Sequence, residues 1–238
     1  MKLIVKTYVG VEAILAKELE QLGATNIEQQ RRVVNCEADK ETLYKICYRS
    51  RLAVRVMVAL AEFPASNEDE VYDNVRRIAW QDVLKKDSTI YIDHVTFSQM
   101  MPDSQYVAQK VKEAIVDQML DATGDRPYVN ADDPDFLINV HVTDERVSVS
   151  LDAVGAPLDR RGYRVEGIDA ATNEVLAAAL VDLSGWEPSQ TLVDPMCGAG
   201  TICIEAAMKA RNIPAAFYRK YPFFFERFKD FDEALWKK

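Results

Sequence analysis

The most chemically informative segment is residues 194–201, which read Asp-Pro-Met-Cys-Gly-Ala-Gly-Thr. Residues 191–194 are apolar enough to predict a short buried strand, and an apolar helix is expected after the glycines. Gly198 and Gly200 let the backbone approach a ligand closely and adopt φ values closed to other residues. Free N–H groups at a helix start favour a polar or anionic group, and Thr201 is expected to cap this helix. The pattern is typical of the first strand-turn-helix of a nucleotide-type binding fold.

Two related phosphate-binding motifs do not fit this segment. It contains no Gly-Lys-Ser/Thr, which excludes a P-loop, and Ile202 or Cys203 occupies the third glycine position of Gly-x-Gly-x-x-Gly, which disfavours a dinucleotide site. Cys197 lies where a nucleophile could sit, but a small residue that packs against backbone is the simpler interpretation. Glu205, on the helix that follows, is expected to be a solvated charge.

The thiol and imidazole groups do not form a metal site. The sequence contains four cysteines and two histidines, without a Cys-x-x-Cys pair or a cysteine beside a histidine: Cys36, Cys47, Cys197, Cys203, His94 and His141. A Cys/His zinc site therefore lacks its ligands. Free thiols in a reducing cytoplasm are the prediction.

A second segment has basic and aromatic residues at close spacing. Residues 155–164 are glycine-marked and poor in core residues, which predicts a connecting loop. Arg160, Arg161 and Arg164 could contact RNA phosphates while Tyr163 stacks on a base. Alternatively, the arginines of a linker pair with the many carboxylates of the chain, and both interpretations stay open.

Aromatic residues mixed with cations fill residues 211–229. They could form a nucleic-acid surface, but filling a core is the commonest use of such side chains and is the favoured interpretation.

Composition narrows the class of protein. The chain has 238 residues and is 48% hydrophobic, which fits one large or two small globular domains, and no run approaches the roughly 20 apolar residues of a membrane span. The net charge of −9 argues against non-specific coating of nucleic acid but allows a local basic face.

Strands and helices alternate in a pattern typical of α+β folds. Strands are predicted at residues 3–9, 33–36, 54–63 and 88–97 and in a hairpin of 136–142 with 147–151. Helices are predicted at residues 11–22, 39–49, 67–80, 106–123 and 173–183.

The segment at 194–201, followed by Ile-Glu-Ala-Ala, resembles the first motif of Rossmann-like S-adenosylmethionine-dependent methyltransferases. More narrowly, with residues 151–164 and 173–180, the chain resembles the THUMP-domain RNA guanine-N2 methyltransferases, including the branch that acts on bacterial 23S rRNA. Such sequences are often labelled N6-adenine DNA methylases. The resemblance spans nearly the whole chain and is most specific from Leu151 onward.

This resemblance implies a cofactor site for S-adenosylmethionine. Gly198 and Gly200 would pack against the methionine part of the cofactor, Asp194 would orient its amino group, and Thr201 would cap the helix. The remaining residues of the implied cofactor loop are Pro195, Cys197 and Ala199.

The resemblance also implies an α+β architecture. A ferredoxin-like subdomain is expected at 1–64, a THUMP RNA-binding domain at 65–154 and a linker at 155–170. The first βα unit of a truncated Rossmann-like methyltransferase domain would then occupy 171–238.

The implied activity is methyl transfer to the exocyclic N2 of a guanine in 23S rRNA, in the cytoplasm, with no metal and no membrane. The family's catalytic Asn-Pro-Pro-Tyr-type loop is absent, as is the acidic residue that holds the cofactor ribose. The chain is therefore expected to be the N-terminal part of a longer enzyme, with no catalytic residue and an incomplete cofactor site, and inactive alone. Alternatives are a tRNA guanine-N2 methyltransferase, a non-catalytic RNA-binding module and a DNA adenine methyltransferase.

Overall fold

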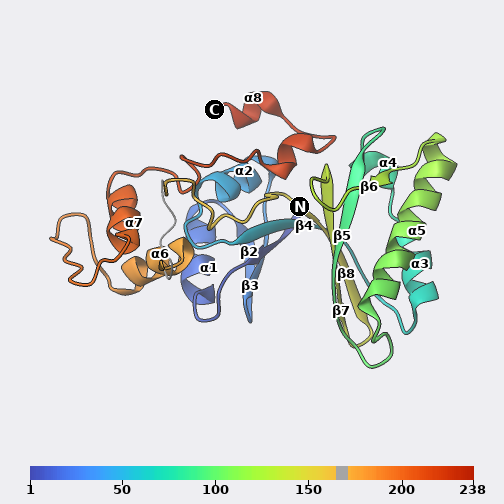
Figure 1. The fold of residues 1–238 in the computed structure, drawn as a ribbon, viewed down its shortest axis with the longest axis horizontal. Helices are drawn as coiled ribbons and strands as arrows, with labels where there is room; N and C mark the ends of the chain where they lie inside the picture. The colour runs from blue at the N-terminus through green and yellow to red at the C-terminus, as the bar shows by residue number, and fades with distance from the viewer. Residues whose placement is uncertain (165–170) are drawn as a thin grey trace. The chain divides into compact units, whose positions relative to one another are not determined.

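The computed structural model describes residues 1–164 and 171–238 (Figure 1). The chain divides into two compact units. The first contains residues 1–56, 154–223 and 238, and the second contains residues 57–153 and 224–237. The predicted linker is described only as far as Arg164, and its remainder lies outside the described residues. No helix in the described part of the chain is long and apolar enough to cross a membrane.

The first unit begins with a small antiparallel sheet in the order β2-β3-β1. Its elements are β1 Lys2–Lys6, α1 Glu12–Gln21, β2 Thr25–Gln30, β3 Val33–Glu37 and α2 Lys40–Arg49, and β4 begins at Arg55. The order β-α-β-β-α-β is that of a ferredoxin-like fold, which confirms the expected N-terminal architecture.

Local signals explain these elements. Leu3 and Val5 alternate along β1 and are fully buried, as are Leu15 and Leu19 on one face of α1. Asp39 accepts a hydrogen bond from the Thr42 N–H at 2.7 Å and so caps α2, as predicted.

The second unit contains a mixed sheet in the order β4-β8-β7-β5-β6. Its strands are β4 Arg55–Pro64, β5 Thr89–Phe97, β6 Tyr128–Val129, β7 Phe136–Thr143 and β8 Arg146–Asp152. β7 and β8 form the predicted hairpin, whereas β5 pairs parallel to both β6 and β7. The helices of this unit are α3 Glu68–Arg76, α4 Trp80–Val83 and α5 Ser104–Thr123. Figure 1 shows α5 and α3 together on one side of the sheet.

The single helix predicted for residues 67–80 is wrong, because α3 ends at Arg76 and α4 starts at Trp80. The fully buried Trp80 donates from its indole nitrogen to the Val75 carbonyl at 2.9 Å. This bond satisfies a carbonyl in the last turn of α3 and lets the chain turn toward the core.

The remaining elements are α6 Glu174–Leu183, α7 Thr201–Ala210, the 3-10 turn η1 Phe224–Arg227 and α8 Glu233–Trp236. Asn173 caps α6 through its side-chain oxygen, as its position before the alanine-rich run suggests. The short strand predicted at 191–194 is wrong: these residues are irregular, and Val193 is 78% exposed. A strand requires a ladder partner, and no strand in the described part of the chain pairs with this segment.

Candidate functional site

The glycine segment forms an open turn that leads into α7. Gly198 and Gly200 have φ of 51° and 71°, in the left-handed region that favours glycine. A Cβ atom at either position would meet nothing within 4 Å, so the space above the turn is open. The turn is closed by the Gly200 N–H, which donates to the Cys197 carbonyl at 2.7 Å. A ligand could therefore approach this backbone directly.

The N-terminus of α7 differs from the expected one. Gly200 rather than Thr201 is the capping residue, and no side chain caps this end of the helix. Thr201 is the first helical residue, buried to 3% exposure, and its hydroxyl oxygen accepts from Arg164 Nη2 at 3.4 Å. The prediction that Thr201 caps the helix is therefore wrong. The first-turn N–H groups of α7 keep the positive end of the helix dipole available for a polar group.

Asp194 stands at the entrance of the turn. Its carboxylate accepts a hydrogen bond from the Met196 N–H at 3.2 Å, which shapes the backbone before the glycines. Met196 itself is 90% exposed, and Cys197 is exposed as well. The turn therefore presents a carboxylate and an apolar surface side by side.

Behind the turn lies a buried polar cluster, which we call the Arg161 cluster and which consists of Arg51, Arg161, Tyr163 and Glu205. Arg161 Nε lies 3.4 Å from Glu205 Oε1, and the side chains of both residues are at most 1% exposed. Arg161 also donates to the carbonyls of Leu158, at 2.7 Å, and Arg51. Glu205 Oε2 lies 3.8 Å from Arg51 Nη1. The cluster ties α7 to the segment that follows α2.

Tyr163 completes the cluster by donating its hydroxyl to Glu205 Oε1 at 3.1 Å. Burial, and then the nearby Glu205 carboxylate, raise the pKa of the Tyr163 phenol far above its usual value. The phenol therefore remains a donor. Glu205 is not the solvated charge that was expected, because it is buried among two guanidinium groups and a phenol. Glu205 is the only charged residue among residues 201–208, which are otherwise mostly apolar. A lone charge in such a helix is the sequence signal that could have indicated a buried, paired carboxylate.

Two further residues of the segment 155–164, Arg164 and Asp159, contact the starts of α6 and α7. Arg164 pairs with Glu174 in the first turn of α6 at 2.8 Å and reaches Thr201 at the start of α7. Asp159 accepts from Asn173, the cap of α6, at 2.9 Å and from the Tyr8 hydroxyl of the N-terminal fold at 3.2 Å.

These contacts bear on the residues predicted to bind RNA. Arg161 is 1% exposed, and Tyr163 and Arg164 are engaged with carboxylates within the unit, whereas Arg160 is exposed. The geometry favours the alternative interpretation, in which arginines of this segment pair with carboxylates of the chain. RNA binding by these residues remains a prediction. Among the four, only Arg160 is exposed and makes none of the contacts described above.

The aromatic residues of 211–229 divide into two groups. Phe223, Phe225 and Phe228 are buried, as the favoured interpretation expected. Phe225 packs edge-on against Trp236 with ring centroids 5.0 Å apart. A second group, which contains Phe217, Tyr218 and Tyr221, is exposed to about half.

Metal ligands do not gather in the described residues, where no group of three or more His, Cys, Asp or Glu side chains could hold an ion. None of the four cysteines, all of which lie in the described residues, forms a disulfide bond.

The thiols differ enough for their reactivity to test the geometry of the turn. We expect iodoacetamide at pH 8 to alkylate exposed Cys197 rapidly and to spare Cys36 and Cys47 in the native chain. Cys36 is 2% exposed, and burial raises its pKa to about 11, so little thiolate is present. Peptide mass spectrometry over time would measure this order. Labelling of Cys36 as fast as Cys197 would contradict the burial described, and equal labelling after unfolding in urea is the control.

Sequence models of three families match successive parts of the chain. An RlmL ferredoxin-like domain matches residues 2–57, a THUMP domain matches residues 65–152, and an RMKL-like methyltransferase domain matches residues 161–236. The last match contains both the glycine turn and the Arg161–Glu205 pair.

Known proteins with similar sequences or structures carry related names. The "Ribosomal RNA large subunit methyltransferase K/L" of Photobacterium profundum is 40% identical over 95% of the chain, which spans 32% of that relative. A solved structure described as "a predicted N6-adenine-specific DNA methylase" from Listeria monocytogenes has a TM-score of 0.90 and 28% identity, over 99% of this chain and 61% of that one. Another, "SMU.472, a putative methyltransferase complexed with SAH", has a TM-score of 0.88 and 30% identity, over 99% and 62%. The chain thus spans about a third of the first relative's length.

Proposed function

Because the chain belongs to the THUMP-domain methyltransferase family, in which a ferredoxin-like domain precedes a THUMP domain and an RMKL-like methyltransferase domain, we propose that its glycine turn binds S-adenosylmethionine. The protein containing the chain transfers a methyl group to ribosomal RNA. The observation that carries this proposal is the open turn at Gly198 and Gly200, above an α7 N-terminus that no side chain caps.

The turn offers groups that suit the parts of this cofactor. Bare backbone at Gly198 and Gly200 receives the methionine part, and the Asp194 carboxylate receives its amino group. When bound, S-adenosylmethionine supplies an activated methyl group to a nucleophile. The remaining residues of the proposed cofactor loop are Pro195, Cys197, Ala199 and Thr201.

Replacing Asp194 tests this assignment. We expect Asp194→Asn to weaken binding of S-adenosylmethionine about tenfold or more, since a charge-assisted hydrogen bond is worth about 1.5–3 kcal/mol. Calorimetric titration of the protein expressed from the complete reading frame that contains this chain measures the dissociation constant. Glu187→Gln, which removes an exposed carboxylate just before the turn, is the matched control and should leave the affinity unchanged. Absence of binding by the unsubstituted complete protein would remove the proposed cofactor site.

Alkylation gives a second, local readout of the same site. Bound S-adenosylhomocysteine should slow the labelling of Cys197 in the turn and leave the slow labelling of Cys36 unchanged. Binding that protects neither thiol would place the ligand elsewhere.

The target atom is proposed to be the exocyclic N2 of a guanine in 23S rRNA, and the reaction to take place in the cytoplasm, where free thiols persist. The test incubates the protein expressed from the complete reading frame that contains this chain with cofactor and with 23S rRNA or tRNA. Nucleoside mass spectrometry should find N2-methylguanosine in the ribosomal RNA. Its appearance in tRNA instead would move the substrate assignment to the alternative.

A DNA adenine methyltransferase is the second candidate, because a similar solved structure carries that description. The match of residues 65–152 to a THUMP domain supports RNA over DNA. Duplex DNA in the same assay, analysed for N6-methyladenine, separates the two activities.

A further inference from the structure

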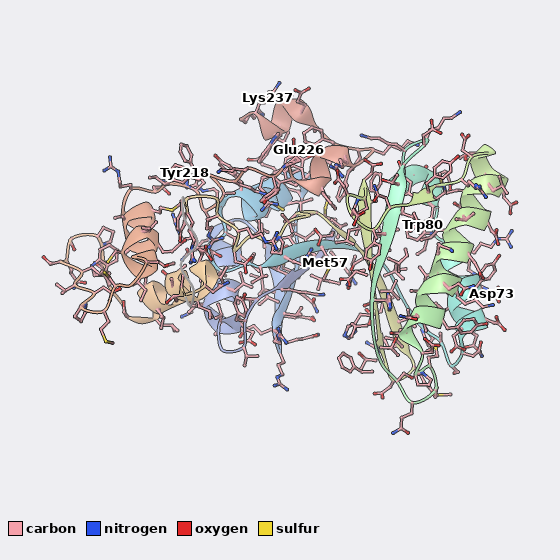
Figure 2. The ribbon with its side chains drawn as sticks, in the orientation of Figure 1. Met57, Asp73, Trp80, Tyr218, Glu226 and Lys237 are labelled. Carbon is pink, nitrogen blue, oxygen red and sulfur yellow. The ribbon has the colours of Figure 1, made fainter. Side chains whose placement is uncertain are left out.

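The segment that follows α7, residues 212–221, presents three aromatic rings to solvent, and we call it the aromatic segment. Phe217 is 56% exposed, Tyr218 46% and Tyr221 51%. Phe217 and Tyr218 meet edge to face, with centroids 4.9 Å apart. Tyr218 is labelled in Figure 2, beyond the end of α7. Large aromatic rings are usually buried, so three half-exposed rings on one short segment require an explanation.

Hydrogen bonds and close packing hold the backbone that carries these rings in place. Arg219 donates to the carbonyls of Val154 and Ala156 at 2.7 Å each, and its Nε donates to the Tyr221 carbonyl at 3.0 Å. Gly162 packs so closely that a Cβ there would lie 2.2 Å from the Tyr218 carbonyl oxygen.

The start of the segment is held in the same way. The Ala216 N–H donates to the Tyr48 carbonyl at 3.0 Å, and Arg49 Nη2 donates to the Asn212 side chain at 2.6 Å. The backbone that carries the rings is therefore already ordered. This lowers the conformational entropy that the protein loses when a ligand binds.

The stretch of sequence that contains the segment is basic. Residues 206–225 contain four Lys and Arg and no Asp or Glu, in a chain whose net charge is −9. Arg211, just before the segment in the sequence, and Lys220, between Tyr218 and Tyr221, are exposed. The unit that carries the segment has 18 Lys and Arg against 15 Asp and Glu, whereas the other unit has 11 against 23. Most carboxylates of the protein, 23 of 38, thus belong to the other unit.

We propose that the aromatic segment binds single-stranded RNA, with unpaired bases stacked on Phe217, Tyr218 and Tyr221 and phosphates near Arg211 and Lys220. The proposal rests on the proposed function and adds to it a contact surface outside the THUMP match. Aromatic rings beside a basic backbone are the combination that holds single strands with little sequence preference, because every base has a π-face. An acidic protein or a second copy of the chain would need no array of stacking rings on a cationic segment.

The test compares the chain with the triple variant Phe217→Ala/Tyr218→Ala/Tyr221→Ala. Fluorescence anisotropy with a labelled, unstructured RNA of about a dozen nucleotides measures affinity. We expect the triple variant to bind at least about tenfold more weakly. Stacking of a base on an aromatic ring contributes about 1–3 kcal/mol, and a tenfold change in affinity corresponds to about 1.4 kcal/mol. Tyr218→Phe/Tyr221→Phe keeps the rings and should retain the affinity.

The outcomes separate this proposal from the proposed function. Calorimetric binding of S-adenosylmethionine to the complete protein should be the same with and without the three substitutions, because the rings lie outside the turn. Equal RNA affinity of chain and triple variant, with RNA binding by both, overturns the surface and leaves the proposed function standing. No RNA binding by the unsubstituted chain also overturns the surface, whereas the proposed function is overturned only if the complete protein fails to bind S-adenosylmethionine or to methylate RNA. If sedimentation shows that the triple variant only abolishes self-association, the surface is an interface between copies and the RNA proposal is overturned.

Discussion

Removing either charge of the buried Arg161–Glu205 pair is expected to destabilise the folded chain by about 3–5 kcal/mol. Each side chain is at most 1% exposed, and Arg161 Nε lies 3.4 Å from Glu205 Oε1. Arg161→Met leaves a carboxylate buried with only the Tyr163 hydroxyl and the more distant Arg51. Glu205→Gln removes the nearest counter-charge of the buried Arg161 guanidinium. Urea denaturation followed by circular dichroism would measure both losses.

An exposed ion pair in the same unit gives the matched control. Lys45 and Glu41 lie 2.6 Å apart on the surface of α2, with both side chains about half exposed. Glu41→Gln should change the free energy of unfolding by less than about 0.5 kcal/mol, because exposed pairs gain little over hydration. The double variant Arg161→Met/Glu205→Leu should recover part of the loss, since no member of the pair then remains charged.

A near-neutral Arg161→Met would contradict the buried pair. The guanidinium would then be hydrated, and the prediction that Arg161 contacts RNA phosphates would regain its basis. The experiment therefore decides between the two interpretations that the sequence left open for residues 155–164.

The parts of the fold that the sequence predicts well are those whose signals are local. The helix over residues 106–123 is closed by Gly124, which has φ of 73°, and α2 is opened by its Asp39 cap. Alternation along residues 136–151 predicts β7 and β8 because one face of this hairpin is buried. Such signals need no knowledge of distant residues.

The errors occur where residues distant in the sequence determine whether a segment forms a strand. β2, Thr25–Gln30, is polar and largely exposed, and it is a strand only because β3 offers its edge, so no apolar alternation marks it. Residues 191–194 have the composition of a strand and lack a ladder partner in the described residues.

The candidate site follows the same division. The positive φ values of Gly198 and Gly200 agree with the expected turn, because glycine spacing is a local signal. The burial of Glu205 depends on Arg161, 44 residues earlier, and on Tyr163. A charged residue in an apolar helix indicates that a buried partner exists, but the partner is identified only by the tertiary fold.

Gly162→Ala is expected to be the other severe substitution, with a loss of about 3 kcal/mol or more in the free energy of unfolding. The residue has φ of +89°, which costs a side chain about 1–2 kcal/mol. The added Cβ would also lie 2.2 Å from the Tyr218 carbonyl oxygen, and overpacking of this kind costs about 1–3 kcal/mol. The Tyr218 carbonyl cannot move away easily, because the next residue, Arg219, is fixed by its hydrogen bonds to the carbonyls of Val154 and Ala156.

Gly10 separates the two contributions, since it has nearly the same φ, +88°, and nothing within 4 Å of its hypothetical Cβ. Gly10→Ala should therefore show the backbone cost alone, and the difference between the two variants in urea denaturation measures the steric contact. Because Gly162 supports the backbone of Tyr218, Gly162→Ala should also weaken binding of unstructured RNA at temperatures where the variant remains folded, whereas Gly10→Ala should not. Equal destabilisation by the two substitutions would mean that the aromatic segment is free to move away, which removes the ordered support on which its proposed stacking of RNA bases depends.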